Sequence, residues 1–307
     1  MRILFITLSN IGDCVLTLPV LDILLDKYPD ADISVLASPR AEGIFRKTPF
    51  IKKIFIYDKK APLKEKIMLI KRMMHEKYDL VADLKNTILP FLLFAKSATK
   101  LFDFSKNIMH MRVRHICRLK SYLRPADINS AGRHFFLNNK QGQEKYGNYI
   151  IMAPGTKGST KRWKEDHFIK LIKKILKQYD FTVILVGDRD DMAITNEIAY
   201  QAGKSVIDLA GKTDLNELAG LIGGAKFIVS CDSACLHFAS YLNVPVIAVF
   251  GPTDPEKYGP WSEKSVVVKK ELGCRPCQKA ECASGAPECI DFISAEEVFG
   301  KIIKIYP

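Results

Sequence analysis

The clearest sign of a parallel α/β sheet is the stretch Ile228-Val-Ser-Cys-Asp-Ser-Ala-Cys-Leu-His-Phe-Ala239. It predicts a buried strand over 227–231, a turn at Asp232 and Ser233, and a helix that continues to about Tyr241. The first backbone N–H groups of such a helix have no partner within the helix, and they lie at the positive end of its dipole. The sequence therefore predicts an anion-binding point here, with Asp232 at or next to the N-cap and His237 one turn further on.

A second landmark follows at once. Residues 244–250 predict another buried strand, which ends in the turn Gly251-Pro-Thr253. Two adjacent parallel strands then open at the same edge of a sheet. Ligands of open α/β sheets bind at this carboxyl edge.

The totals favour a globular chain of two domains. The 307 residues are 48% hydrophobic and 26% charged. The longest apolar run, 88–95, is too short to span a bilayer and contains Pro90. The start, MRILFITLS, is a strand pattern without the cleavage site of a signal peptide, so we expect a cytoplasmic protein.

The net charge of +12 is unevenly distributed. Residues 1–145 carry 26 Lys and Arg against 14 Asp and Glu, whereas the remainder carries 20 of each. This asymmetry favours an anionic partner for the first half, and a solvated Lys-rich surface is the alternative. Because no nucleic-acid-binding motif is present, an anionic membrane surface or a phosphorylated lipid fits better than nucleic acid.

The first half alternates strands and helices, which predicts a parallel, doubly wound sheet. Asp13 follows the first strand directly and lies beside a helix N-terminus, where it is either a helix cap or a catalytic base. A polar linker over 138–148 separates two expected domains, 1–143 and 144–307. The expected elements are strands at 2–9, 32–37, 53–57 and 79–84, and helices at 14–27 and 63–77.

The second half repeats the pattern. A strand at 149–153 runs into the Gly-rich basic turn 154–163, and the last helix, 295–305, is a candidate to pack back on the first domain. Thr156, Lys161 and the hydroxyls between them suit a diphosphate, although the spacing is not that of a Walker A loop. An exposed Lys-rich turn is the alternative, but Trp163 looks anchored. The other expected elements are helices at 164–179, 191–202 and 215–222, and strands at 182–186 and 206–209.

In residues 88–125, apolar clusters such as 91–94 alternate with basic residues such as Lys96. Such a mixture suits contact with anionic lipid. The alternative is that the apolar residues belong to the core and the bases form its solvated rim.

These motifs resemble glycosyltransferase family 9, the heptosyltransferases of lipopolysaccharide core assembly, nearly end to end. The resemblance implies a GT-B fold, in which two Rossmann-like, doubly wound α/β domains face each other across a cleft. One motif differs, because Ala234 stands where the family usually has Gly. The resemblance is carried by residues 9–19, 154–163, 210–215, 232–237 and 250–253.

The resemblance also implies the site. Asp13 would be the general base of an inverting transfer, and Lys161 would ease the departure of ADP. The donor would be bound by Thr156, Lys157, Lys161, Thr213, Leu215, Asp232, Ser233, Ala234 and His237. On local grounds alone, His237 fits a core histidine better than a catalytic one.

The implied reaction needs no metal and no cofactor. An ADP-sugar, expected to be ADP-heptose, is the donor, and an anionic lipid-linked lipopolysaccharide core is the acceptor. The basic first domain would contact the inner leaflet of the inner membrane. Two alternatives stay open: a nucleotide-sugar epimerase of GT-B fold, and a non-catalytic module that binds a nucleotide or another anion.

Four of the eight cysteines cluster in one segment, as Cys274-x2-Cys277-x4-Cys282-x6-Cys289. This spacing leaves a structural metal, reduced thiols and disulfides all open. Cys14, Cys117, Cys231 and Cys235 are expected to be small core residues.

Overall fold

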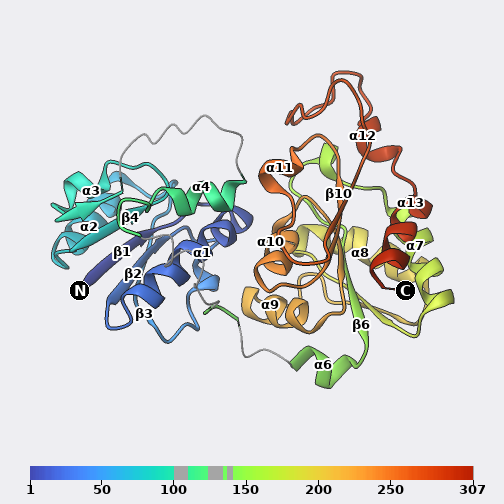
Figure 1. The fold of residues 1–307 in the computed structure, drawn as a ribbon, viewed down its shortest axis with the longest axis horizontal. Helices are drawn as coiled ribbons and strands as arrows, with labels where there is room; N and C mark the ends of the chain where they lie inside the picture. The colour runs from blue at the N-terminus through green and yellow to red at the C-terminus, as the bar shows by residue number, and fades with distance from the viewer. Residues whose placement is uncertain (100–109, 124–133, 137–140, 307) are drawn as a thin grey trace. The chain divides into compact units, whose positions relative to one another are not determined.

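The structure, a computed structural model, divides the chain into two compact units, unit 1 (Met1–Phe135) and unit 2 (Phe136–Pro307) (Figure 1). It describes all residues except 100–109, 124–133, 137–140 and 307. The predicted linker, 138–148, begins outside the described residues and then contains the helix α6 (Gln141–Tyr146).

Unit 1 is built on a parallel sheet of five strands in the order β3-β2-β1-β4-β5. The central strand β1 is buried from Ile3 to Ile6 because both faces of the sheet are covered. The strands are β1 (Arg2–Ile6), β2 (Asp32–Ala37), β3 (Ile51–Ile56), β4 (Leu80–Asp83) and β5 (Ser97–Ala98). The helices are α1 (Ile11–Lys27), η1 (Glu42–Ile44), α2 (Leu63–Met74), α3 (Leu89–Leu92) and α4 (Met111–Cys117).

Unit 2 has a parallel sheet of six strands in the order β11-β10-β9-β6-β7-β8. Its strands are β6 (Tyr149–Ala153), β7 (Thr182–Leu185), β8 (Val206–Asp208), β9 (Ile228–Cys231), β10 (Val246–Phe250) and β11 (Val266–Lys269). Its remaining helices are η2 (Ser159–Lys161), α7 (Glu165–Gln178), η3 (Arg189–Asp191), α8 (Met192–Ala202), α9 (Leu215–Gly224), α10 (Ala234–Tyr241), α11 (Pro255–Tyr258), α12 (Glu288–Asp291) and α13 (Ala295–Ile305).

The prediction of two parallel, doubly wound α/β units is confirmed, and most element boundaries agree within three residues. The edge strand β11 was not predicted, because its short run of valines carries little periodic signal. The last helix, α13, packs on α7, β10 and β11 of its own unit. Among the described residues, we find no helix that combines the length and the apolar character needed to cross a bilayer.

Candidate active site

Residues 228–239 form the predicted strand and helix. β9 ends at Cys231, and α10 begins at Ala234 after Ser233, whose extended backbone makes it the N-cap residue. The Ser233 hydroxyl lies 3.0 Å from that of Ser230, with which it shares a hydrogen bond. Among the described residues, the Ser233 side chain makes no capping hydrogen bond, so it leaves the first N–H groups of α10 to another acceptor. Asp232 precedes the N-cap, as predicted.

Lys161 and Asp232 form an ion pair at this edge. Because β6 and β9 are neighbours in the sheet, the turns that follow them lie side by side. The Lys161 Nζ lies 2.7 Å from the Asp232 Oδ2, and the two side chains are 32% and 9% exposed. A partly exposed ammonium therefore stands beside the N-terminus of α10, an arrangement that suits an anion of more than one charge.

The loop 154–163 brings a second polar group to the same edge. Thr156 is buried, and its Oγ1 has no hydrogen-bond partner among the residues that the structure describes. A buried hydroxyl without a partner is costly, so it marks a place where a ligand atom or water would be stabilised.

Lys157 is held differently from Lys161. Its Nζ lies 2.8 Å from Asp188 and 2.9 Å from Asp190, and these hydrogen bonds, the one with Asp188 first, raise the pKa of Lys157. It is exposed, and both carboxylates follow β7. The geometry thus ties Lys157 to the turn after β7 rather than to Asp232.

Trp163 anchors the end of the loop, as predicted. It is fully buried, its Nε1 donates to the Ile293 carbonyl at 2.7 Å, and its ring stacks on His167 with centroids 5.3 Å apart. At the start of the loop, the backbone of Gly155 packs closely against Asp191. A Cβ at position 155 would lie only 2.1 Å from the Asp191 carboxylate, so only glycine fits there. The loop is therefore held at both ends, which positions the residues between them.

His237 is buried in α10, and its ring stacks on Trp261 with centroids 6.0 Å apart. Thr253, in the turn after β10, is buried with an Oγ1 that finds no partner within the described chain. Neither Trp261 nor Thr253 was among the predicted site residues. Thr253 belongs to the Gly-Pro-Thr turn and could have been chosen, whereas no sequence signal marks Trp261.

Thr213 and Leu215 lie further along the edge. They follow β8, the outermost strand, and both are half-buried. Between them, Asp214 caps α9 in a capping box with Glu217, so this turn is rigidly set.

Asp13 lies in unit 1, after the central strand β1. The structure corrects its local role: α1 begins at Ile11 with Asn10 as the N-cap, so Asp13 is in the first turn and is not the cap. The Asn10 Nδ2 donates to the Asp13 Oδ2 at 2.9 Å. Asp13 is half-buried.

The structure thus brings most predicted donor residues to neighbouring strand ends of unit 2, with Thr213 and Leu215 at the far side of the same sheet. The prediction that four cysteines are small core residues is confirmed for Cys14, Cys231 and Cys235, which are buried. Cys117 is only half-buried. Burial raises the pKa of each of these three buried thiols to about 12, so they are inert packing groups.

Comparison with known proteins identifies the family. The family described as glycosyltransferase family 9 (heptosyltransferase) matches residues 125–286, more than half of the chain. Lipopolysaccharide heptosyltransferase 3 of Escherichia coli is 29% identical and aligns with 83% of this chain and 85% of its own length. Lipooligosaccharide heptosyltransferase 2 of Haemophilus ducreyi is 28% identical, with 97% of each chain covered.

The solved structures agree in fold. The ADP-heptose lipopolysaccharide heptosyltransferase II of E. coli superposes with a TM-score of 0.80 at 23% identity, over 99% of this chain and 98% of that chain. The E. coli heptosyltransferase WaaC with ADP gives a TM-score of 0.76 at 22% identity, over 99% and 100%. Together with the family match, this agreement confirms the GT-B fold and the predicted resemblance: the chain belongs to glycosyltransferase family 9, the heptosyltransferase family.

Proposed function

We propose that this enzyme transfers a heptose from ADP-heptose to a sugar of the lipopolysaccharide core. The observation that carries the proposal is the Lys161–Asp232 pair beside the N-terminus of α10, a charged site for a diphosphate within the region that matches the family. The names of the relatives, which are heptosyltransferases of lipopolysaccharide or lipooligosaccharide, support the choice of sugar and acceptor. A solved relative in complex with ADP supports the choice of nucleotide.

In this proposal, unit 2 binds the donor. The diphosphate accepts hydrogen bonds from Thr156, from Lys161 and from the first N–H groups of α10, and Thr213 and Leu215 flank the adenosine. Two carboxylates, Asp188 and Asp190, hold the Lys157 ammonium, whereas one carboxylate, Asp232, holds that of Lys161 beside the N-terminus of α10, so we assign the main neutralising charge to Lys161. His237 and Ser233 hold the N-terminus of α10, the end assigned to the donor, in place.

The proposed reaction is an inverting displacement that requires no metal. Asp13 accepts the proton of the acceptor hydroxyl, whose oxygen attacks the anomeric carbon from the face opposite the nucleotide. The bond between that carbon and the diphosphate oxygen breaks, and ADP leaves with the electron pair. Lys161 and the dipole of α10 stabilise the developing charge in place of a divalent cation.

Ala234 is a feature of this chain that bears on the donor. It is the first residue of α10, where the family pattern usually has Gly. The added methyl group keeps a ligand slightly further from the helix backbone. We therefore propose that Ala234 helps to select the sugar attached to ADP.

The acceptor is lipid-linked, and a surface on unit 1 suits a membrane. We define the α2–α3 surface by Leu63, Ile67, Ile88, Phe91 and Phe94, which are 72%, 45%, 64%, 69% and 82% exposed. The segments of α2 and α3 contribute Met73, Leu89 and Leu93 to the same apolar cluster of unit 1. Large apolar side chains exposed in such a group mark an interaction site.

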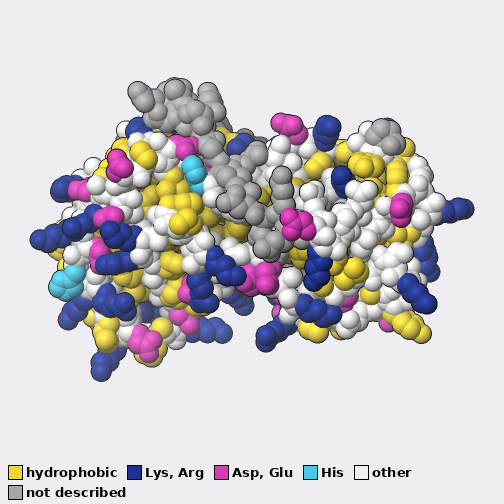
Figure 2. Space-filling model, turned by 90° about the horizontal axis from the view of Figure 1, so that it is seen from below, with side chains coloured by type: hydrophobic (Ala, Val, Ile, Leu, Met, Phe, Trp, Pro, Cys, Tyr) yellow, Lys and Arg dark blue, Asp and Glu magenta, His cyan; other side chains and the backbone are white. Residues whose placement is uncertain are grey.

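The positive charge of unit 1 indicates the chemistry of such a partner. Figure 2 shows Lys and Arg side chains spread over the visible face of unit 1, around hydrophobic side chains. Lys64, Lys71 and Arg72 lie on α2 itself, and the chain carries its excess positive charge in this half. Apolar anchors among bases fit an anionic lipid surface, so we propose that the enzyme acts as a peripheral protein at the inner leaflet.

The proposal is tested with purified enzyme, a panel of ADP-, GDP- and UDP-sugars and lipid-linked core acceptors. We expect ADP-heptose alone to stabilise the protein, by about 2.7 kcal/mol at 100 times its dissociation constant. Transfer should release one ADP per sugar added, at a rate that is the same with and without Mg²⁺ or Mn²⁺. An epimerised free sugar nucleotide, or binding without turnover in the presence of acceptor, would contradict the proposal.

A further inference from the structure

The segment between β11 and α12 contains few apolar side chains. Between Glu271 and Glu288, Leu272 is the one large aliphatic side chain. Burial of apolar surface normally offsets the entropy that a segment loses when it is ordered, and this segment has almost none to bury. It does contain Cys274, Cys277 and Cys282, and Cys289 follows in α12.

The first half of the segment is fixed to the turn after β10. The guanidinium of Arg275 donates to the Gly251 carbonyl and to the Lys270 carbonyl, each at 2.6 Å. The backbone N–H of Gln278 donates to the Pro252 carbonyl at 3.0 Å. Cys274 and Cys277 are therefore carried on a stretch whose position is set by unit 2.

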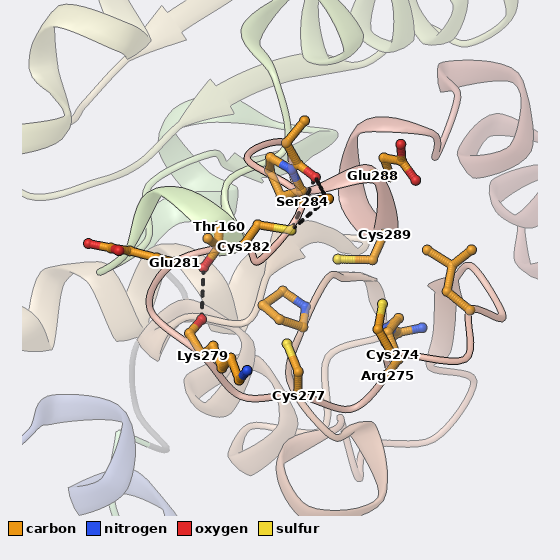
Figure 3. Close-up of a pocket in the computed structure, with 14 residues that line it drawn as sticks. Thr160, Cys274, Arg275, Cys277, Lys279, Glu281, Cys282, Ser284, Glu288 and Cys289 are labelled. Atoms are coloured by element: carbon orange, nitrogen blue, oxygen red, sulfur yellow. Dashed lines mark hydrogen bonds between the residues drawn. The ribbon is translucent and has the colours of Figure 1, made fainter.

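All four thiols line one small pocket, and all four are free (Figure 3). Figure 3 shows their sulfurs directed from different sides toward the middle of this pocket. Thiols bind a metal ion as thiolates, so a cation held between the four sulfurs would displace their protons.

We propose that Cys274, Cys277, Cys282 and Cys289 bind one tetrahedral metal ion of the class that four thiolates select, zinc or a single iron. The pair Cys-x2-Cys is the usual first half of such a site, and four sulfur ligands complete it. Among the described residues, no three His, Cys, Asp or Glu side chains already stand in ligating positions. Binding therefore draws the segment inward, and Cys282 exchanges its hydrogen bonds with Ser284 and Ala286 for the metal.

The metal would also brace the donor loops, an effect that rests on the proposed function. The Thr160 hydroxyl donates to the Lys279 carbonyl at 3.3 Å, so the segment contacts the loop that carries Lys161. Gly251 fits closely against the same loop, since a Cβ there would lie 3.0 Å from the Thr160 carbonyl. The ion would be structural and would take no part in the chemistry.

The first test is the metal content of the full chain, purified without chelators and measured by mass spectrometry. We expect one zinc or iron per chain, and none in Cys277→Ser or Cys282→Ser. Cys117→Ser is the matched control and should keep the ion, because Cys117 lies in unit 1. Cobalt added to stripped wild-type protein should give the intense visible bands and the thiolate charge-transfer absorption of a tetrahedral sulfur site.

The second test is functional. Removing the ion should raise the KM for the donor several-fold and speed proteolysis at Lys279, with a smaller change in kcat. Wild-type protein without metal that also fails to bind added zinc or iron, or peptide mapping that finds disulfides among the four cysteines, would overturn the site. The metal-binding and disulfide readings do not depend on turnover, so they stand even if the proposed reaction is wrong. A bound ion with an unchanged donor KM would overturn the bracing role.

Discussion

The two units share a parallel α/β plan, yet they differ in the charged pairs and the exposed apolar side chains that they carry. In unit 2, the turns are held by internal ion pairs and caps: Lys161 with Asp232, Lys157 with Asp188, and Asp214 with Glu217. In unit 1, Asp13 accepts one hydrogen bond from Asn10, and large apolar side chains are exposed on α2 and α3. In the proposed function, this difference would reflect the two ligands, a small charged donor for unit 2 and a large lipid-linked acceptor for unit 1.

The largest expected effect is on Asp13, the proposed base of unit 1. Asp13→Asn keeps the shape and the hydrogen bond with Asn10 but cannot take a proton, so kcat should fall by roughly 10²–10⁴-fold. ADP binding, measured by calorimetry, should stay within about twofold of the wild type because the donor belongs to unit 2 in this proposal. Asp30→Asn, an exposed change after the end of α1, is the control. An active Asp13→Asn enzyme would remove the assigned role.

The next effect tests the charge of unit 2. Lys161→Met removes the cation of the 2.7 Å pair and leaves the nearly buried Asp232 to repel the diphosphate. We expect kcat/KM to fall about 10²-fold, in the range seen when a group that stabilises transition-state charge is removed. Lys164→Met is the matched control, because Lys164 is close in sequence but pairs with Asp291. Equal losses in the two variants would assign Lys161 a merely structural part.

A third prediction separates the stabilities of the units in acid. His115 of α4 is buried, and neither ring nitrogen has a partner within the described chain; burial, with Arg118, Arg114 and His110, lowers its pKa to about 4. The unfolded chain, with a pKa near 6.5, then binds more protons than the folded one. Unit 1 should therefore lose stability as the pH falls from about 6.5 to about 4, by roughly 3 kcal/mol in total.

The two tryptophans make this measurable. Trp163 and Trp261 both lie in unit 2, so tryptophan fluorescence reports on that unit, whereas circular dichroism reports on both. In urea titrations at falling pH, the dichroism midpoint should drop below the fluorescence midpoint. His115→Leu should abolish the gap, and His75→Leu, an exposed position, should keep it. Midpoints that move together in the wild type would argue against an acid-labile unit 1.

Much of this comparison could be predicted from sequence because the relevant signals are local. The continuous apolar strands, the turn at Asp232 and Ser233, and the helix after it were predicted within about a residue. The start of α1 was not, since Asn10 caps a helix whose first residues, Ile11 and Gly12, are poor helix formers. The pairing of Lys161 with Asp232 needs the order of β6 and β9, which lie far apart in the chain. Similarly, the stacking of Trp261 on His237 depends on long-range packing that no local pattern encodes.

The smallest expected effect concerns the α2–α3 surface. Of the residues 91–94, Leu93 is buried and the other three are exposed, so the region divides between the lipid-contact and core interpretations. Phe94 is the most telling of them. It is 82% exposed and has a φ of 48°, a conformation that a bulky residue rarely adopts. A solvent-exposed ring held at that backbone cost fits a contact outside the chain.

We expect Phe91→Ser with Phe94→Ser to weaken binding to vesicles that contain anionic lipid by about tenfold, the effect of burying part of two rings. Tyr200→Ser removes an equally exposed ring from unit 2 and should have no effect. Raising the salt concentration should weaken the wild type and the double variant alike, because the bases around the surface remain in both. If the double variant binds as tightly as the wild type, charge alone holds unit 1 at the membrane, and the apolar side chains of α2 and α3 must serve the acceptor or another partner.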